Sequence, residues 1–175
     1  MTNRKKIDFI ITGALIAAAY AGLTYLSNVF GLAYGPIQLR VSEVLTILPV
    51  FTPAAIPGLT IGCFIANIGS FNVADLLFGT CATLAAAILT YFLKEIKFKG
   101  IPFLAFFPPV IVNAIVIGFE IAIFFLPEGF TAWGFIISGL EVGLGQLIVC
   151  YVFGIPFYIL VEKYNIFGRK FNPNK

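Results

Sequence analysis

Long stretches of apolar residues, interrupted by Gly, Pro, Asn and charged side chains, constrain the fold of this chain more than any other feature. Five such stretches cover residues 9–30, 44–68, 74–93, 101–126 and 133–161. A helix of roughly 20 mostly apolar residues crosses the hydrocarbon core of a bilayer. Only 11% of the 175 residues are charged, against about 25% in a soluble domain. The sequence therefore predicts an all-α membrane protein with one transmembrane domain, residues 1–175.

The second apolar stretch contains three prolines at four-residue spacing, Pro49, Pro53 and Pro57. Proline has no backbone N–H and clashes with the preceding helical turn, so one unbroken helix is not expected here. A break near Thr52 divides the stretch into two shorter spans. Six spans then result, at residues 8–30, 38–51, 54–70, 74–94, 101–126 and 133–162. The basic start of the chain shows no small-residue cleavage site, and the first span is expected to be retained.

The positions of the basic residues favour six spans over five. Cytoplasmic flanks of membrane helices are enriched in Lys and Arg. Six spans place both termini and the loop at 94–99 on one side, together with ten of the eleven basic residues, whereas five spans would place that loop and the basic tail outside. We therefore expect both termini to be cytoplasmic. The ten residues are Arg4, Lys5, Lys6, Lys94, Lys97, Lys99, Lys163, Arg169, Lys170 and Lys175.

The composition argues against catalysis, metal binding and nucleic-acid binding. Histidine is absent, which removes the most common general base and metal ligand. No zinc, phosphate-loop or nucleophile-elbow motif occurs. Cys63, Cys81 and Cys150 lie in apolar stretches without paired spacing and are expected to pack as small hydrophobic residues. The net charge of +3 is spread over three flanks rather than one stripe. We expect no enzyme activity and no cofactor.

Two acidic residues inside the spans, Glu120 and Glu141, are the strongest candidates for a functional site. An ionisable group in hydrocarbon costs several kcal/mol and usually has a function. In the six-span arrangement both lie in the outer half of the membrane. Asn113 precedes Glu120 by seven residues, about two helical turns, which places both on one helix face. That face is predicted to line a pocket that opens to the outside.

Further polar residues converge on the same outer level, and some have a simpler explanation. Arg40 and Glu43 are three residues apart and alternatively pair with each other. Asp75 alternatively caps its helix, and Gln146 alternatively forms an interhelical hydrogen bond. Trp133 is available for stacking on a planar ligand. The candidate ligand-binding residues are Glu141, Glu120, Asn113, Asn67, Gln146, Arg40, Glu43, Asp75 and Trp133.

The first span contains small residues at four-residue spacing, in one row with Ala14 and Ala18 and a second row with Ala17 and Ala21. Small side chains let another membrane helix approach closely. The rows fit packing within the same chain and contact with a partner protein equally well, and the sequence alone does not separate the two.

Four segments resemble one family of membrane proteins. They are Arg40-Val-Ser-Glu-Val-Leu-Thr-Ile-Leu-Pro-Val-Phe-Thr-Pro-Ala-Ala-Ile-Pro-Gly-Leu, Ile61-Gly-Cys-Phe-Ile-Ala-Asn67, Asp75-Leu-Leu-Phe-Gly-Thr and Val149-Cys-Tyr-Val-Phe-Gly-Ile-Pro. Together they are similar to the QueT family, whose members are substrate-binding S components of energy-coupling factor (ECF) transporters. The first segment is the most specific of the four.

The resemblance implies six helices, a bacterial cell membrane and an outward-facing pocket. It also implies that the first helix docks on the transmembrane T subunit of the transporter, with Ala14 and Ala18, or Ala17 and Ala21 as the competing frame, and that two ATPase subunits drive uptake. The implied ligand is a 7-deazaguanine precursor of queuosine or the base queuine. Glu120 or Glu141 would accept its guanine-like edge, Asn67, Asn113 or Gln146 would contact its ring carbonyl, and Trp133 would stack on it. Backbone groups at 31–37 are alternative contacts.

Rival functions remain at this point. An S component for riboflavin or thiamin would share the fold and the alanine rows, although the Arg40–Glu43 segment argues against it. A non-transporting scaffold would not need acids and amides at one depth. A channel would need polar residues through the full thickness of the membrane, whereas the inner half here is almost entirely apolar.

Overall fold

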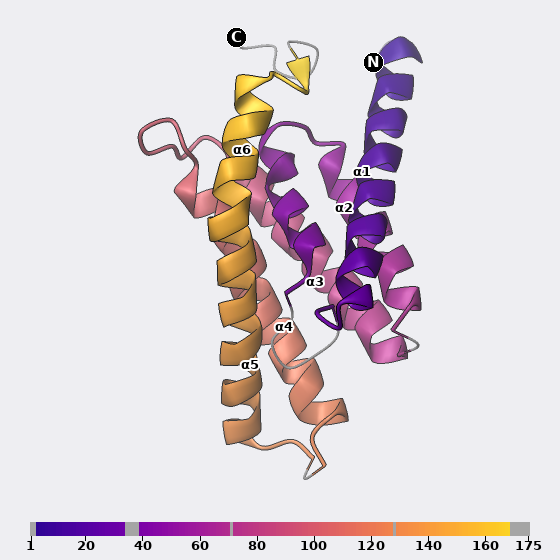
Figure 1. Ribbon diagram of the computed structural model, residues 1–175, viewed down its shortest axis with the longest axis vertical. Coiled ribbons are helices and arrows are strands. Elements are labelled where there is room, and N and C mark those ends of the chain that lie inside the picture. The colour runs from indigo at the N-terminus through magenta and orange to yellow at the C-terminus, as the bar shows by residue number, and fades with distance from the viewer. Residues whose placement is uncertain (1–2, 34–38, 71, 128, 169–175) are drawn as a thin grey trace.

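The apolar stretches of the sequence form helices, and short connections containing Gly, Pro or polar residues separate them (Figure 1). The computed structural model describes residues 3–33, 39–70, 72–127 and 129–168. Within these ranges the structure is all-helical, apart from one isolated bridge between Phe98 and Ile101. The elements are α1 (Asn3–Val29), η1 (Val41–Val50), α2 (Ala55–Ile68), α3 (Val73–Phe92), η2 (Phe103–Phe106), α4 (Phe107–Phe124), α5 (Ala132–Leu147), η3 (Ile148–Phe153) and α6 (Gly154–Lys163).

Four helical segments are long and apolar enough to cross a membrane. They are α1, α3, the continuous run of η2 and α4, and the 32-residue run of α5, η3 and α6. The chain is thus an all-helical, multi-pass membrane protein, as the composition predicted. The expected spans at 38–51 and 54–70 correspond to η1 and α2, which have 10 and 14 residues, fewer than the roughly 20 of a full α-helical span. The number of six complete spans stays a prediction.

The proline-rich part of the chain forms a 3₁₀-helix, which the sequence did not predict. Element η1 has 3₁₀ geometry over ten residues and contains Pro49. A 3₁₀-helix rises about 2.0 Å per residue, whereas an α-helix rises about 1.5 Å. Ten residues therefore extend over about 20 Å, which partly offsets the shortness of the element. The connection to α2 contains Thr52, where the proline spacing predicted a break.

The start of α1 and the end of α6 lie at the same end of the bundle. Figure 1 shows the start of α1, the connection between α3 and η2, and the end of α6 together, while the connection between α4 and α5 lies at the opposite end. We call the first the basic end, because Lys94, Lys97, Lys99 and Lys163 occur in these segments, and the second the far end. This arrangement agrees with termini on one side of a membrane, and their cytoplasmic location stays a prediction.

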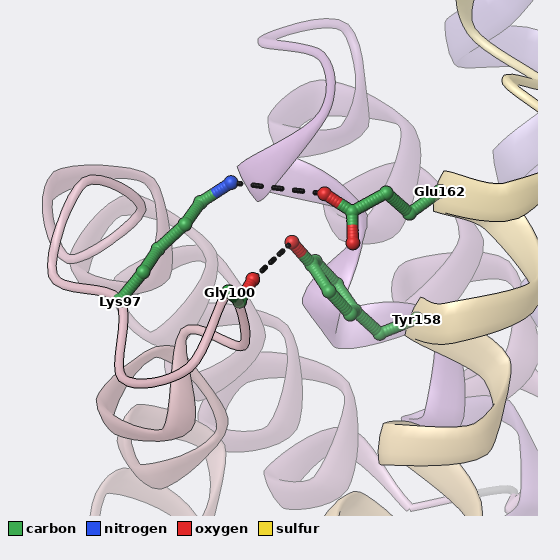
Figure 2. Close-up of polar contacts among 4 residues, drawn as sticks. All are labelled: Lys97, Gly100, Tyr158 and Glu162. Atoms are coloured by element: carbon green, nitrogen blue, oxygen red, sulfur yellow. Dashed lines mark hydrogen bonds and ion pairs between the residues drawn. The ribbon is translucent and has the colours of Figure 1, made fainter.

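Aromatic side chains fill the basic end and attach the connection after α3 to α6. Tyr158 donates its hydroxyl to the Gly100 carbonyl at 3.3 Å, and Lys97 Nζ lies 3.9 Å from Glu162 Oε1 (Figure 2). The Tyr158 ring stacks on Phe51, with 5.0 Å between the ring centroids. An exposed ion pair contributes at most about 1 kcal/mol. The packed rings, rather than the ion pair, therefore hold this end together.

Helices α1 and α2 approach so closely that their backbones touch. A Cβ atom at Gly62 would lie 2.8 Å from the Ala17 carbonyl oxygen and 2.8 Å from Tyr20 Cβ. Ala17 and Ala21 are buried, whereas Ala14 and Ala18 are exposed. Of the two alanine rows, the row with Ala17 and Ala21 is thus buried within the chain, and the docking of either row on a partner stays a prediction.

Replacing Gly62 with Ala should destabilise the protein, because the new methyl group collides with the backbone of α1. Overpacking of this kind costs roughly 1–3 kcal/mol. Gly22→Ala on the exposed face of α1 is the matched control, since nothing lies within 4 Å of a Cβ atom there and alanine favours a helix by about 0.5–1 kcal/mol over glycine. Thermal unfolding in detergent measures both variants. Equal melting temperatures for the two would contradict the close contact.

Candidate ligand-binding site

A buried arginine connects three elements toward the far end of the bundle. Arg40, at the start of η1, donates from Nε to the Ala33 carbonyl at 2.8 Å and from Nη1 to Asn67 Oδ1 at 3.2 Å. Asn67, in the last turn of α2, donates from Nδ2 to the backbone carbonyl of Asp75 at 2.9 Å. The arginine is only 6% exposed. These bonds join η1 to α2 and α2 to the first turn of α3.

The close approach of α3 to Asn67 requires a glycine in α3. A Cβ atom at Gly79 would lie 2.5 Å from Asn67 Nδ2. The same amide nitrogen lies 3.4 Å from Cys63 Sγ, which also accepts a hydrogen bond from Thr83 at 3.1 Å. The amide of Asn67 is therefore held from both sides, which fixes the oxygen that Arg40 contacts.

Glu43, in η1, is buried with one carboxyl oxygen in use and one available. The Tyr20 hydroxyl of α1 donates to Glu43 Oε1. Beside this contact, Thr24 of α1 donates to the Ser42 hydroxyl at 2.7 Å. Glu43 Oε2 is buried and has no hydrogen-bond partner among the described residues. The first helix thus positions a carboxyl group that still has one acceptor oxygen to offer.

Glu120, near the end of α4, is the most unusual residue of the structure. Its side chain is 0% exposed, and neither carboxyl oxygen has a hydrogen-bond partner within the described parts of the chain. Asp75 and then Arg40 are the charged groups that act on it. Buried polar groups are almost always hydrogen-bonded, and an exception calls for an explanation. A ligand that donates hydrogen bonds would satisfy both oxygens.

The last long helix joins this region through its π-helical segment, η3. Cys150 of η3 contacts Gln146 Oε1 at 3.6 Å and lies 3.9 Å from both Thr46 Oγ1 and the Glu43 carbonyl oxygen. Gln146 is buried. Short π-helical turns often occur at functional sites. The π-helical segment thus places the Cys150 thiol against η1, and the same thiol contacts the amide of Gln146.

Most of the predicted site residues come together, and three lie apart from the hydrogen-bonded cluster. Arg40, Asn67, Asp75, Glu43, Glu120 and Gln146 form or adjoin the contacts above. Asn113 is buried on α4, Glu141 is partly exposed on α5, and the Trp133 side chain is 74% exposed at the start of α5. The structure therefore does not bring Trp133 into the cluster, and residues 34–37 of the proposed backbone contacts fall outside the described residues.

The sequence analysis left two simpler roles open, an Arg40–Glu43 pair and a helix cap at Asp75, and the described hydrogen bonds differ from both. Glu43 accepts its hydrogen bond from Tyr20, and Arg40 donates to Ala33 and Asn67, so these described contacts differ from the expected Arg40–Glu43 pair. Asn72, not Asp75, caps α3, because its side chain accepts from the Ala74 N–H at 2.8 Å.

Tyr20 and Thr24 are the site residues that the sequence analysis missed. Ala17, Tyr20, Thr24 and Ser27 follow one another at spacings of three, four and three residues, which places them on one face of a helix. All four are buried. This polar extension of the alanine row was the signal available in the sequence.

Comparisons with known proteins identify the family. The profile of the QueT transporter family matches residues 10–163. A queuosine precursor transporter, QueT, of Lactococcus lactis subsp. cremoris is 39% identical over 99 residues, which are 57% of this chain and 57% of that protein. The chain is thus aligned with little more than half of that relative, and no solved structure gives a significant match. Because the family profile covers most of its residues, the chain belongs to the QueT transporter family.

Proposed function

We propose that this protein is the substrate-binding S component of an ECF transporter. It captures a 7-deazaguanine precursor of queuosine, or queuine, from outside the cell for ATP-driven uptake. Membership of the QueT transporter family and the name of the Lactococcus relative support the substrate class. The observation that carries the proposal is the buried carboxyl of Glu120, with two oxygens that lack partners among the described residues.

The chemistry of Glu120 matches a guanine-like edge. Such an edge presents two adjacent N–H donors, and a carboxylate accepts both in a bidentate contact. Both oxygens of Glu120 are available for this contact. Asn113, two turns earlier on α4 and also buried, offers an amide N–H to the ring carbonyl. One helix face thus presents an acceptor pair and a donor, which is the complement of that edge.

The rival functions fit these residues less well. The imide edge of riboflavin places one N–H between two carbonyls and would oppose carbonyl oxygens to a carboxylate. A scaffold gains nothing from a buried acid without a hydrogen-bond partner, since such a group costs several kcal/mol. A channel needs a polar path, whereas aromatic side chains fill the basic end. Substrate capture by a transporter subunit therefore accounts best for Glu120.

The exposed row on α1 supports the proposed partner. Ala14 and Ala18 are exposed, and Gly22 continues the same row. A flat surface of small side chains lets a second membrane helix approach closely. We propose that this row docks on the T subunit, which two ATPase subunits energise. In this arrangement the basic end faces the cytoplasm and the ligand enters from the far end.

Replacing Glu120 with Gln should weaken binding of 7-aminomethyl-7-deazaguanine, 7-cyano-7-deazaguanine and queuine by tenfold or more, because one oxygen of the acceptor pair becomes an N–H donor. Isothermal titration of the detergent-purified protein measures the affinities, with riboflavin, thiamin and guanine as comparison ligands. Glu141→Gln is the matched control and should bind nearly as the wild type does. The melting temperature of ligand-free Glu120→Gln should stay close to that of the wild type, since the amide and the carboxyl group have nearly the same size. Unchanged affinity in the Glu120 variant would overturn the role of this residue.

The double variant Ala14→Leu and Ala18→Leu should lose association with the T subunit and lose uptake, while ligand binding by the isolated chain is retained. Larger side chains hold the helices apart, but they meet nothing within this chain because both positions are exposed. Co-purification with the tagged T subunit and uptake of the labelled ligand measure the effect. Ala85→Leu, at an exposed alanine of α3, is the control. Full association of the double variant would refute docking through this row.

A further inference from the structure

The connection between α3 and η2, residues 93–102, lies where the chain leaves and re-enters the membrane. It follows α3 and precedes the continuous run of η2 and α4, and both are long and apolar enough to cross a membrane. The 20 residues of α3 measure about 30 Å along the helix axis, which matches the thickness of a hydrocarbon core. This connection therefore lies at the level of the lipid headgroups. We call it the basic loop, because it contains Lys94, Lys97 and Lys99.

The backbone of the basic loop forms a tight turn. Phe98 and Ile101 exchange two backbone hydrogen bonds, at 2.9 and 3.1 Å. The two residues between them, Lys99 and Gly100, have φ angles of 50° and 84°, and two consecutive positive φ angles are typical of a type I′ turn. The contacts with α6 in Figure 2 attach this turn to the bundle. The position of its side chains is thus set by the fold of the protein.

Apolar side chains on and beside this turn are exposed. Ile96 is 54% exposed, Phe98 66% and Leu104 51%. The Phe98 ring contacts the ring of Phe103, with 6.4 Å between the centroids. Exposed apolar side chains gathered in one loop indicate contact with a membrane or a protein. At the headgroup level, aromatic and aliphatic side chains insert into the boundary of the hydrocarbon core.

The lysines around these apolar side chains carry charge that the described residues do not neutralise. One of them pairs with Glu162, whereas Lys94, Lys99 and Lys163 form no ion pair within the described ranges. Each of these three lies over an aromatic ring, with 3.9 to 5.8 Å between Nζ and the ring centroid. A ring attracts a cation but does not cancel its charge. With Glu95, the loop and the end of α6 hold four lysines and two acids, which leaves a formal charge of +2.

From these observations we infer that the basic loop binds the headgroups of anionic phospholipids. Phe98 and Ile96 insert at the boundary of the hydrocarbon core, and the ammonium groups of Lys94 and Lys99 contact the lipid phosphates. A soluble anion would leave the apolar side chains in water, and an apolar protein surface would leave the lysines without a counter-charge. A lipid satisfies both at the depth that α3 sets. This inference does not depend on the transported ligand.

Fluorescence quenching by brominated lipids tests which lipid contacts the loop. Trp133, the one tryptophan of the chain, lies at the start of α5 and thus at the far end. The double variant Phe98→Trp and Trp133→Phe therefore reports on the basic loop, and the wild type is the control for the far end. Both full-length chains are reconstituted in vesicles of phosphatidylglycerol and phosphatidylcholine, with one of the two lipids brominated at a time.

At the loop, phosphatidylglycerol should bind at least about fivefold more tightly than phosphatidylcholine, the effect of one lysine near an anionic lipid surface. Trp133 of the wild type should show no such preference. Adding Lys94→Gln and Lys99→Gln should remove the preference at the loop, while contact with phosphatidylcholine persists because the apolar side chains remain. Lys5→Gln with Lys6→Gln is the matched control. It removes the same charge from exposed positions at the start of α1 and should keep the preference.

Three results would overturn the inference. Equal affinity of the two lipids at the loop would exclude the selection of anionic headgroups. A preference that survives without Lys94 and Lys99, or that falls equally without Lys5 and Lys6, would assign it to the overall charge of the basic end. Quenching by neither lipid would place the loop in water, as expected for a surface that docks on a protein.

Discussion

The guanidinium of Arg40 is the interaction on which the polar interior depends. A charged group at this depth is tolerated only where hydrogen bonds and opposite charges compensate it. Its bonds to the Ala33 carbonyl and to Asn67 hold the segment before η1 against the end of α2, and its charge acts on Glu43 and Glu120. Without it, neither of these two buried acids would have a basic residue near it in the sequence. Arg40 thus has a structural and an electrostatic role at once.

The helical class and the long helices followed from hydropathy, whereas the geometry of the short ones did not. The runs that form α3 and α4 are mostly apolar, and in a bilayer a helix satisfies their backbone hydrogen bonds internally. The spacing of Pro49, Pro53 and Pro57 predicted an interruption but not the 3₁₀ geometry of η1, because proline limits the α-helix without specifying its replacement. The π-helical turn of η3 carries no comparable signal in the sequence.

The sequence predicted several residues of the candidate site, but it did not predict which hydrogen bonds these residues form. Polar residues inside apolar runs identified Arg40, Asn67 and Glu120, because each is costly to bury without a role. The hydrogen bond from Tyr20 to Glu43 could not be predicted from the sequence, because the two residues lie on different elements. Trp133 was selected for its chemistry and its position near a helix end, but its ring is turned to the outside. Such orientation is set by packing around α5 and not by residue type.

The two alanine rows of α1 have a consequence for how substitutions in this helix should be read. Ala17 and Ala18 are adjacent in sequence, and their side chains point about 100° apart around the helix axis. One lies against Gly62 of α2 and the other is exposed. Neighbouring positions therefore report on different properties: a larger residue at 17 tests whether the chain folds, and a larger residue at 18 tests the proposed docking on a partner. Under the proposed docking, a scan along this helix should alternate between loss of folded protein and loss of assembly with helical periodicity.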